Sequence, residues 1–285
     1  MGLDAKTVAF TVLALVAFAS NSLLTRLALG AREIDAATFT LLRLASGALV
    51  LAFAVRVQSG TFEGLRRRGV LGPLALFGYA APFSFAYLRI GAAVGALVLF
   101  GVVQLTMVGY GIFRGERPAP FAWFGLSLAL LGLAILTVPA ASRPNPFGVL
   151  LMATAGVAWG AYSLAGRTNA EPIAANAWSF LASSLLALLL LLVFHASVTA
   201  TARGIGLALV SGGITSGLGY AVWYRALPRL SVTQAAVAQL SVPVIAALGA
   251  AVFLDETLGA RFVTASAAVL GGVALVLAVR SRRPT

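Results

Sequence analysis

The sequence contains no cysteine and a single histidine among its 285 residues. Without thiols it can form no disulfide, and it lacks the ligands of iron–sulfur clusters and of thiolate zinc sites. Charged residues are also scarce, at 10% of the chain, whereas soluble proteins carry about 25%. These absences exclude an ordinary water-exposed surface, and we expect neither a metal nor a cofactor.

Long apolar runs take up most of the chain, and 60% of the residues are hydrophobic. A membrane-spanning helix needs about 20 mainly apolar residues, so ten of them fill about 200 positions and leave room for short loops alone. We therefore predict an all-α integral membrane protein with ten transmembrane helices. The breaks between apolar runs place these spans at residues 6–29, 34–57, 69–88, 91–113, 119–140, 146–167, 173–194, 204–225, 230–254 and 258–279.

The two halves of the chain resemble each other at an offset of 140 residues. Gly115-Glu116 precedes an apolar run just as Asp255-Glu256 does. Each half holds five spans, an odd number, so the second half starts from the opposite face of the membrane. We predict two inverted five-helix repeats, residues 1–142 and 143–285, which is typical of an alternating-access carrier. Chance similarity between helices rich in Ala, Leu and Gly is the alternative.

Lysine and arginine are distributed unevenly over the predicted loops. With the N-terminus inside, thirteen of them lie on the inner side and six on the outer side. Cytoplasmic loops carry the excess of basic residues, so we expect both termini in the cytoplasm. The net charge of +12 follows from this topology, and we expect no nucleic-acid binding. The first apolar segment has a counterpart in the second half, so we do not interpret it as a cleaved signal peptide.

All eight acidic residues lie in predicted loops or at span ends. Proton-coupled exporters of lipophilic cations usually hold the proton or the cation on a carboxylate inside the membrane. Because no such carboxylate is visible, a neutral or zwitterionic cargo moving down its own gradient is favoured. A proton-coupled multidrug or cationic-compound efflux carrier is the alternative.

Arg43 is the one permanent charge near the middle of a predicted span. A guanidinium facing lipid is costly, so we expect it to face the bundle interior. There it could bind a carboxylate of the cargo, or it could donate hydrogen bonds to backbone carbonyls of a neighbouring helix. The structural role is the preferred interpretation, and the other stays open.

Aromatic and amide side chains form a second polar set within the spans. They lie in the first helix of each half and in the third and fourth helices, so the repeat symmetry brings them toward one cavity near the midplane. Such a lining suits a cargo with an apolar side chain and a polar head. Together with Arg43, the candidate substrate-binding residues are Phe18, Asn21, Tyr79, Tyr87, Gln104, Trp159, Tyr162, Trp223 and Gln239. The alternative for the Trp and Tyr residues is a place in the interfacial aromatic belt.

Two prolines lie inside predicted spans. Pro82 and Pro243 weaken the helices that contain them and are the candidate hinges. The segment Gly101-Val102-Val103-Gln104 stands in the first half where the second has Pro243. We therefore expect the two halves to move unequally.

Several short motifs in the two halves form a recognisable set. They are Val16-Ala17-Phe18, Val157-Ala158-Trp159-Gly160, Tyr87-Leu88-Arg89-Ile90, Tyr224-Arg225-Ala226-Leu227, Ser241-Val242-Pro243-Val244 and the acidic turns named above. With Arg43, this set resembles the EamA-like transporters of the drug/metabolite transporter superfamily over nearly the whole chain. The resemblance implies ten helices, cytoplasmic termini and export of small metabolites. The aromatic lining looks most like that of bacterial exporters of aromatic and other amino acids.

The predicted function is export of aromatic and other apolar amino acids and similar small metabolites across the bacterial inner membrane, by alternating access. The chain offers no visible nucleophile–base pair, so we do not expect an enzyme. A passive channel is a further alternative. The expected partners are a small-molecule substrate and the lipid bilayer, and the oligomeric state is left open, with a monomer compatible.

Overall fold

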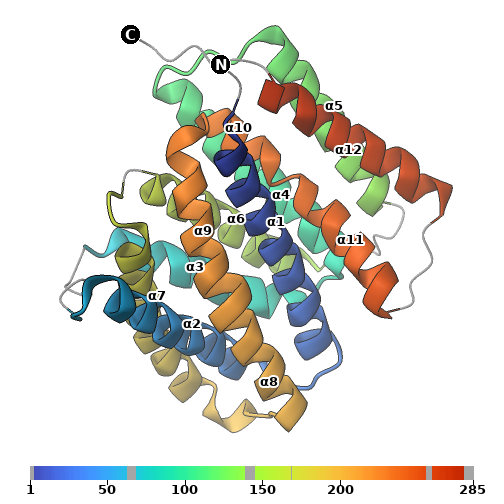
Figure 1. Cartoon of the computed structure of the whole chain (residues 1–285). Coiled ribbons are helices and arrows are strands. Elements are labelled where there is room, and N and C mark those ends of the chain that lie inside the picture. Colours follow the sequence, from blue (N-terminus) through green and yellow to red (C-terminus); the bar gives the residue numbers. More distant parts are fainter. Residues whose placement is uncertain (1–2, 63–68, 139–144, 168, 255–258, 279–285) are drawn as a thin grey trace.

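The structure, a computed structural model, describes residues 3–62, 69–138, 145–167, 169–254 and 259–278. Within these ranges the chain is helical and forms no sheet (Figure 1). The α-helices are α1 (Ala5–Thr25), α2 (Ala36–Ser59), α3 (Leu71–Tyr87), α4 (Ala92–Phe113), α5 (Pro120–Thr137), α6 (Pro146–Gly166), α7 (Pro172–Val193), α8 (Ala202–Val210), α9 (Gly219–Ala226), α10 (Val232–Ala238), α11 (Ser241–Leu254) and α12 (Ala260–Ala278). The π-helical segments are η1 (Arg26–Gly30) and η5 (Ser211–Leu218), and the 3₁₀ segments are η4 (His195–Ser197) and η6 (Leu227–Arg229).

Nine helical segments in the described ranges are long and apolar enough to cross a membrane. Three of them join consecutive elements: α1 with η1, α8 through η6, and α10 with α11. Helix α3 has 17 residues, at the lower end of the length that spans a bilayer. The chain is thus a multi-pass membrane protein, and every predicted span coincides with a helical segment to within four residues. The count of ten spans stays a prediction.

Short polar residues and prolines determine where the helices begin. The Asp4 carboxylate accepts the Thr7 N–H at 2.7 Å at the start of α1. Asp35 does the same for Thr38 at 2.9 Å at the start of α2. A proline occupies the first turn of α5, α6 and α7, where no intrahelical N–H bond is lost. These are the breaks that separate the apolar runs in the sequence.

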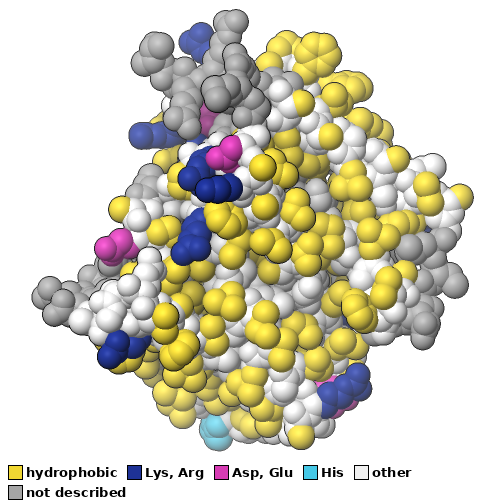
Figure 2. Space-filling model, in the orientation of Figure 1, with side chains coloured by type: hydrophobic (Ala, Val, Ile, Leu, Met, Phe, Trp, Pro, Cys, Tyr) yellow, Lys and Arg dark blue, Asp and Glu magenta, His cyan; other side chains and the backbone are white. Residues whose placement is uncertain are grey.

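The outer surface is apolar over the middle of the molecule. Figure 2 shows hydrophobic side chains across this region, with Lys, Arg, Asp and Glu mostly toward the two ends. Leu105, Phe53 and Val193 are each at least 70% exposed. In water such a surface would promote aggregation, whereas in a bilayer it faces hydrocarbon.

The helices pack in four groups. Helix α5 lies against α12, and α2 lies against α7 (Figure 1). Helix α6 packs on α3 and α4, while α1 packs on α9 and α11. The start of α1 and the end of α12 lie at one end of the bundle (Figure 1). We call this the Glu116 end, because Glu116 follows α4 there, and we call the opposite end, where α1 passes into η1, the Arg26 end.

Two close helix contacts depend on glycine. A Cβ at Gly272 of α12 would lie 2.7 Å from the Ala129 backbone nitrogen of α5. A Cβ at Gly212 of η5 would overlap the Arg43 carbonyl oxygen of α2. The absence of a side chain lets these backbones touch, as is common between membrane helices.

The two halves differ where Pro243 occurs. Pro243 has no N–H to donate to the Gln239 carbonyl, and this carbonyl accepts the Val242 N–H at 3.0 Å instead. The helical segment is interrupted there, between α10 and α11. Helix α4, which the predicted repeat pairs with this segment, runs unbroken. The acidic turn Asp255-Glu256 and the repeat boundary between residues 142 and 143 lie outside the described residues.

Candidate functional site

Aromatic rings from α1, α3, α6 and α9 gather in the interior of the bundle. The Phe18 ring meets Trp159, Tyr220 and Trp223 edge to face, with ring centroids 5.3, 5.5 and 5.7 Å apart. Tyr79 lies 5.0 Å from Trp159. We call these five residues, Phe18, Tyr79, Trp159, Tyr220 and Trp223, the aromatic cluster. All five are buried, and edge-to-face contacts of this kind are favourable beyond the area that they bury.

Amide side chains connect the aromatic cluster to the break between α10 and α11. The Trp159 Nε1–H donates to the Gln239 Oε1 at 2.5 Å. Gln239 Nε2 in turn donates to the Met107 Sδ at 3.4 Å and to the Ala235 carbonyl at 3.1 Å. Gln104 donates to the Ala236 carbonyl at 2.8 Å. Helices α4, α6 and α10 are therefore joined by polar contacts at this depth.

Arg43 is buried, which confirms that it faces the bundle interior. Its Nε donates to the Ser216 hydroxyl at 2.9 Å, and one Nη donates to the phenols of Tyr79 and Tyr220 at 3.2 and 2.7 Å. The structural interpretation had named backbone carbonyls as acceptors, and this detail is wrong, because all three acceptors are side-chain hydroxyls. The other Nη is buried and has no hydrogen-bond partner among the described residues. The guanidinium also lies 5.2 Å from the ring centroid of Tyr79, within cation–π range.

Other predicted residues hold neighbouring helices in place. The Asn21 Oδ1 accepts the Ser211 hydroxyl at 2.6 Å, which ties α1 to η5. The Tyr162 hydroxyl donates to Asn176 of α7 at 2.7 Å. The Trp223 Nε1–H donates to the Ser163 hydroxyl at 3.4 Å. π-Helical segments such as η5 are rare and often lie at functional sites.

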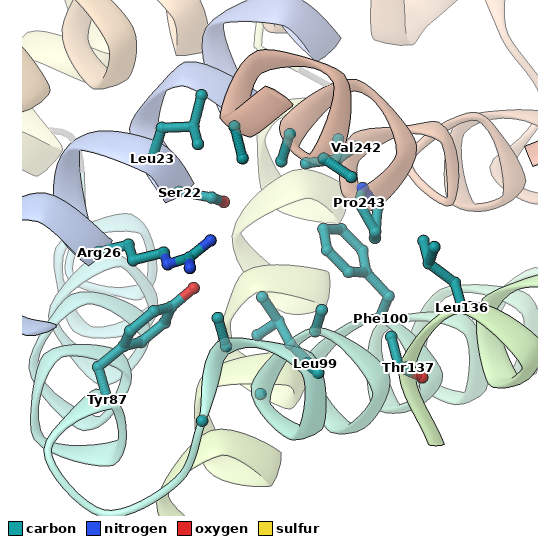
Figure 3. Close-up of a pocket in the computed structure, with 18 of the residues that line it drawn as sticks. Ser22, Leu23, Arg26, Tyr87, Leu99, Phe100, Leu136, Thr137, Val242 and Pro243 are labelled. Atoms are coloured by element: carbon teal, nitrogen blue, oxygen red, sulfur yellow. The ribbon is translucent and has the colours of Figure 1, made fainter. Parts of the chain in front are cut away.

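Two cavities lie beside the aromatic cluster. The smaller has a volume of about 20 Å³, close to that of one water molecule. It is lined by Phe18, Asn21, Ser22, Tyr79, Phe83, Leu99, Phe100, Trp159, Tyr220, Gln239 and Val242. The larger, which we call the Arg26 cavity, has a volume of about 420 Å³ and lies at the Arg26 end (Figure 3). Pocket volumes of about 300 Å³ and above are typical of small-molecule sites.

The structure thus distributes the predicted residues over three places. Phe18, Asn21, Tyr79, Trp159 and Gln239 line the smaller cavity. Tyr87 and the candidate hinge Pro243 line the Arg26 cavity. Gln104, Tyr162, Trp223 and Arg43 are not among the residues that line either cavity. Pro82 lies within α3, one residue before Phe83, which lines both cavities.

Sequence reasoning missed three residues at these cavities. Phe83 follows Tyr79 by four residues and precedes Tyr87 by four, so the three share one face of α3. This spacing of four residues could have been used to predict Phe83 from the sequence. Tyr220 lies in a segment that alternates between π- and α-helix, which no periodicity rule predicts. The topology count treats Arg26 as one of the six basic residues of the outer side, with no role at a site, yet its guanidinium points into the Arg26 cavity (Figure 3).

At the Glu116 end, a side chain caps a helix that is distant in the sequence. The Glu116 carboxylate accepts the Val232 N–H at 2.7 Å, the Thr233 N–H at 3.2 Å and the Thr233 hydroxyl at 3.0 Å. It therefore satisfies donors at the start of α10 from the loop that follows α4. We call this set of three hydrogen bonds the Glu116 cap.

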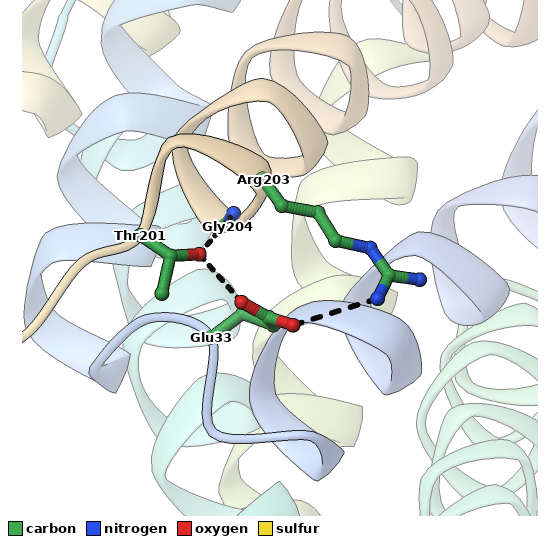
Figure 4. Close-up of polar contacts among 4 residues, drawn as sticks. All are labelled: Glu33, Thr201, Arg203 and Gly204. Atoms are coloured by element: carbon green, nitrogen blue, oxygen red, sulfur yellow. Dashed lines mark hydrogen bonds and ion pairs between the residues drawn. The ribbon is translucent and has the colours of Figure 1, made fainter.

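At the Arg26 end, the loop after η1 is bound to the loop before α8. The Glu33 carboxylate accepts the Thr201 hydroxyl at 2.5 Å and pairs with Arg203 at 3.5 Å (Figure 4). Asp35 accepts the Thr199 N–H at 3.0 Å. The five acidic residues in the described ranges all lie in loops or at helix ends, as predicted for them.

The apolar outer surface and the buried polar and aromatic interior fit a membrane transporter. The model of the EamA-like transporter family matches residues 146–278. An uncharacterized protein of Pseudomonas aeruginosa is 50% identical over 280 residues, which cover 98% of this chain and 97% of that protein. The chain belongs to the EamA-like transporter family. The prediction of a transporter rather than an enzyme is confirmed.

More distant relatives extend the comparison. A "probable terminal-alkyne amino-acid exporter" of Streptantibioticus cattleyicolor is 23% identical, and the match covers 95% of this chain and 93% of that protein. An uncharacterized transporter of Archaeoglobus fulgidus is 24% identical, with 82% of this chain and 84% of the relative covered. A solved crystal structure matches with a TM-score of 0.81 at 22% identity, covering 96% of this chain and 98% of its own. At this level of identity, the structural similarity shows that the two proteins share a fold.

Proposed function

We propose that this protein exports aromatic and other apolar amino acids, and similar small metabolites, by alternating access. The observation that carries the proposal is the aromatic cluster, whose members come from both halves of the chain and four of whose five residues line a cavity of about 20 Å³. Rings at this depth suit an apolar cargo side chain. The amino-acid exporter among the relatives supports the same cargo class.

The proposed architecture is ten helices in two inverted repeats, at residues 1–142 and 143–285, with α3 as the tenth span. The packing supports it, because α6 packs on α3 and α4 as α1 packs on α9 and α11. Helices α2 and α7 are equivalent in this scheme and contact each other, as do α5 and α12. A two-fold axis in the membrane plane would produce this pattern.

The proposed location is the bacterial inner membrane, with both termini in the cytoplasm. The excess of basic residues on one side supports this orientation. The Glu116 end then faces the cytoplasm and the Arg26 cavity faces outward. In this state the path is closed at the aromatic cluster and at the Glu116 cap, and the space that remains lies on the outer side.

In this scheme Arg43 is a positioning residue, because its guanidinium holds the phenols of Tyr79 and Tyr220 through hydrogen bonds. These two phenols belong to rings that line the smaller cavity. The interrupted segment at Pro243 is the proposed hinge of the second half, and Pro82 that of the first. The unbroken α4 supports unequal motion of the two halves.

The test is uptake of labelled compounds into proteoliposomes, with and without an imposed proton gradient. We expect saturable uptake of tryptophan and leucine that the gradient does not change, together with counterflow. Gradient-driven movement of lipophilic cations alone would contradict the proposal and identify a cationic-drug exporter, since aromatic rings also bind cations. Uptake without saturation or counterflow would identify a channel.

A further inference from the structure

The charged lining of the Arg26 cavity is positive. Its walls come from α1, η1, α3, α4, α5 and α11. Most of the lining is apolar, with Leu99, Phe100 and Val242 at its inner part shared with the smaller cavity. Arg26 is the one charged side chain among the described residues that line it, and no Asp or Glu is among them.

Donors for an anion converge at one side of the cavity. The Arg26 guanidinium and the Tyr87 hydroxyl both point into the space (Figure 3). The start of α4 lines the same cavity through Gly91, Ala92 and Ala93, and its N-cap residue, Gly91, has no side chain that could cap the first N–H groups. The first N–H groups of a helix carry partial positive charge and lack intrahelical acceptors. A carboxylate placed here meets a guanidinium, a phenol and a helix start together.

An acceptor lies one helical turn from Arg26. The Ser22 hydroxyl donates its hydrogen to the Phe18 carbonyl at 3.2 Å, so its oxygen lone pairs are available toward the cavity. Ser22 and Arg26 are four residues apart and lie on one side of their helix. Figure 3 shows both polar ends turned toward the same space. This pairing of donor and acceptor suits a group that carries a carboxylate next to an ammonium.

We infer that the Arg26 cavity is a second binding site for the cargo, outside the aromatic cluster, and that it recognises the head group of an α-amino acid. Arg26 binds the carboxylate, the Ser22 oxygen accepts from the ammonium, and Leu99, Phe100 and Val242 contact the side chain. This inference rests on the proposed export function and specifies its substrate class. A cation without a carboxylate is repelled by Arg26 and gains nothing from the start of α4.

The absence of cysteine allows a test that does not depend on transport. Ala93→Cys places one thiol in the wall of the Arg26 cavity, and Ala96→Cys provides a second, independent position. Each variant, purified in nanodiscs, is reacted with methanethiosulfonates that carry either a sulfonate or a trimethylammonium group. We expect the sulfonate to be favoured, and Arg26→Gln to lower the ratio of the two rates by about fivefold through the loss of one nearby charge.

The matched control is Arg32→Gln. Arg32 is exposed at the same end of the bundle and does not line the cavity, so the ratio should stay unchanged. The second arm is protection: tryptophan should slow the labelling of Ala93→Cys, while tryptophan amide and tryptamine should not. Protection should disappear in Arg26→Gln and return in part in Arg26→Lys, which restores the charge without the planar fork.

The outcomes separate this inference from the proposed function. Equal rates for both reagents, a ratio that Arg26→Gln does not change at either cysteine position, or protection by tryptamine as strong as by tryptophan would each overturn the Arg26 site. Amino-acid uptake in proteoliposomes could still be found in that case, and the proposed function would stand. Charge-selective labelling with protection by tryptophan, but without tryptophan uptake, would support the site and contradict the proposed export function.

Discussion

The Arg26 end and the Glu116 end of the bundle carry charged side chains of opposite sign beside a helix start. At the Arg26 end, a guanidinium borders a cavity of about 420 Å³, and the start of α4 has no side-chain cap. At the Glu116 end, a carboxylate occupies the equivalent place at the start of α10 and makes three hydrogen bonds to it. The two helix starts correspond in the proposed repeat, at the predicted offset of 140 residues. The start of α10 is capped by a side chain from another helix end, whereas the N-cap residue of α4 is a glycine and provides no side-chain acceptor.

We therefore expect the capping of these helix starts to influence which end of the transporter is closed. A buried helix start without partners is costly, so a carboxylate that reaches it from another helix stabilises the packed state. Where such a cap is lacking, water or a cargo anion has to provide the acceptor.

Filling the Arg26 cavity should abolish transport. Ala96 lines this cavity, and Ala96→Trp places an indole ring in the space that the cargo must cross. We expect tryptophan uptake in proteoliposomes to fall at least tenfold. Leu105→Trp, on the exposed face of the same helix, is the control and should transport normally. Normal transport by Ala96→Trp would show that the cargo takes another path.

Replacing the guanidinium between the two ends should destabilise the protein. Arg43→Lys cannot reach Ser216, Tyr79 and Tyr220 together, because an ammonium lacks the planar fork of arginine. Loss of buried hydrogen bonds should lower the free energy of unfolding by about 2 kcal/mol. Thermal unfolding in detergent measures this, with Arg32→Gln as the exposed control.

Uptake by the folded fraction of Arg43→Lys distinguishes the two interpretations of Arg43. A positioning role predicts that the KM of the folded protein stays within a few-fold of the original. A large rise in KM with unchanged stability would instead indicate that Arg43 contacts the cargo.

Weakening the Glu116 cap should open the closed end. Glu116→Gln keeps one acceptor oxygen and loses the charge, which we expect to cost about 1 kcal/mol. A change of this size shifts a two-state population by about fivefold. The labelling rate of a thiol at Val108→Cys, a buried position of α4 near this end, should therefore rise. Glu33→Gln, at the opposite end, should leave this rate unchanged.

The helices were predictable because residues next to each helix end determine where it begins or ends. Asp4, Asp35 and the prolines that begin α5, α6 and α7 interrupt apolar runs, and each acts within one turn of its own position. The buried position of Arg43 was predictable for a different reason, since lipid excludes a permanent charge.

The sites were less predictable because their contacts are distant in the sequence. Glu116 caps a helix that begins more than 100 residues later, and Ser216 binds Arg43 across 173 residues. The π-helical turns that bring Arg26 and Tyr220 to their positions follow no repeating pattern. The predicted residues do gather in the interior, yet packing closes the space between them to about 20 Å³ and leaves the larger volume at the Arg26 end.

The smallest expected effect is that of pH on transport. No Asp, Glu or His is among the described residues that line the two cavities. Guanidinium groups stay charged over the whole physiological range, and an amino acid stays a zwitterion between about pH 5.5 and 7.5. Tryptophan uptake, measured with equal pH on both sides of the proteoliposome membrane, should therefore vary by less than about twofold over that range. A steep dependence would mean that a titrating group takes part in the transport cycle. Proton binding would then have to be added to the difference between the anion-binding Arg26 end and the carboxylate-capped Glu116 end.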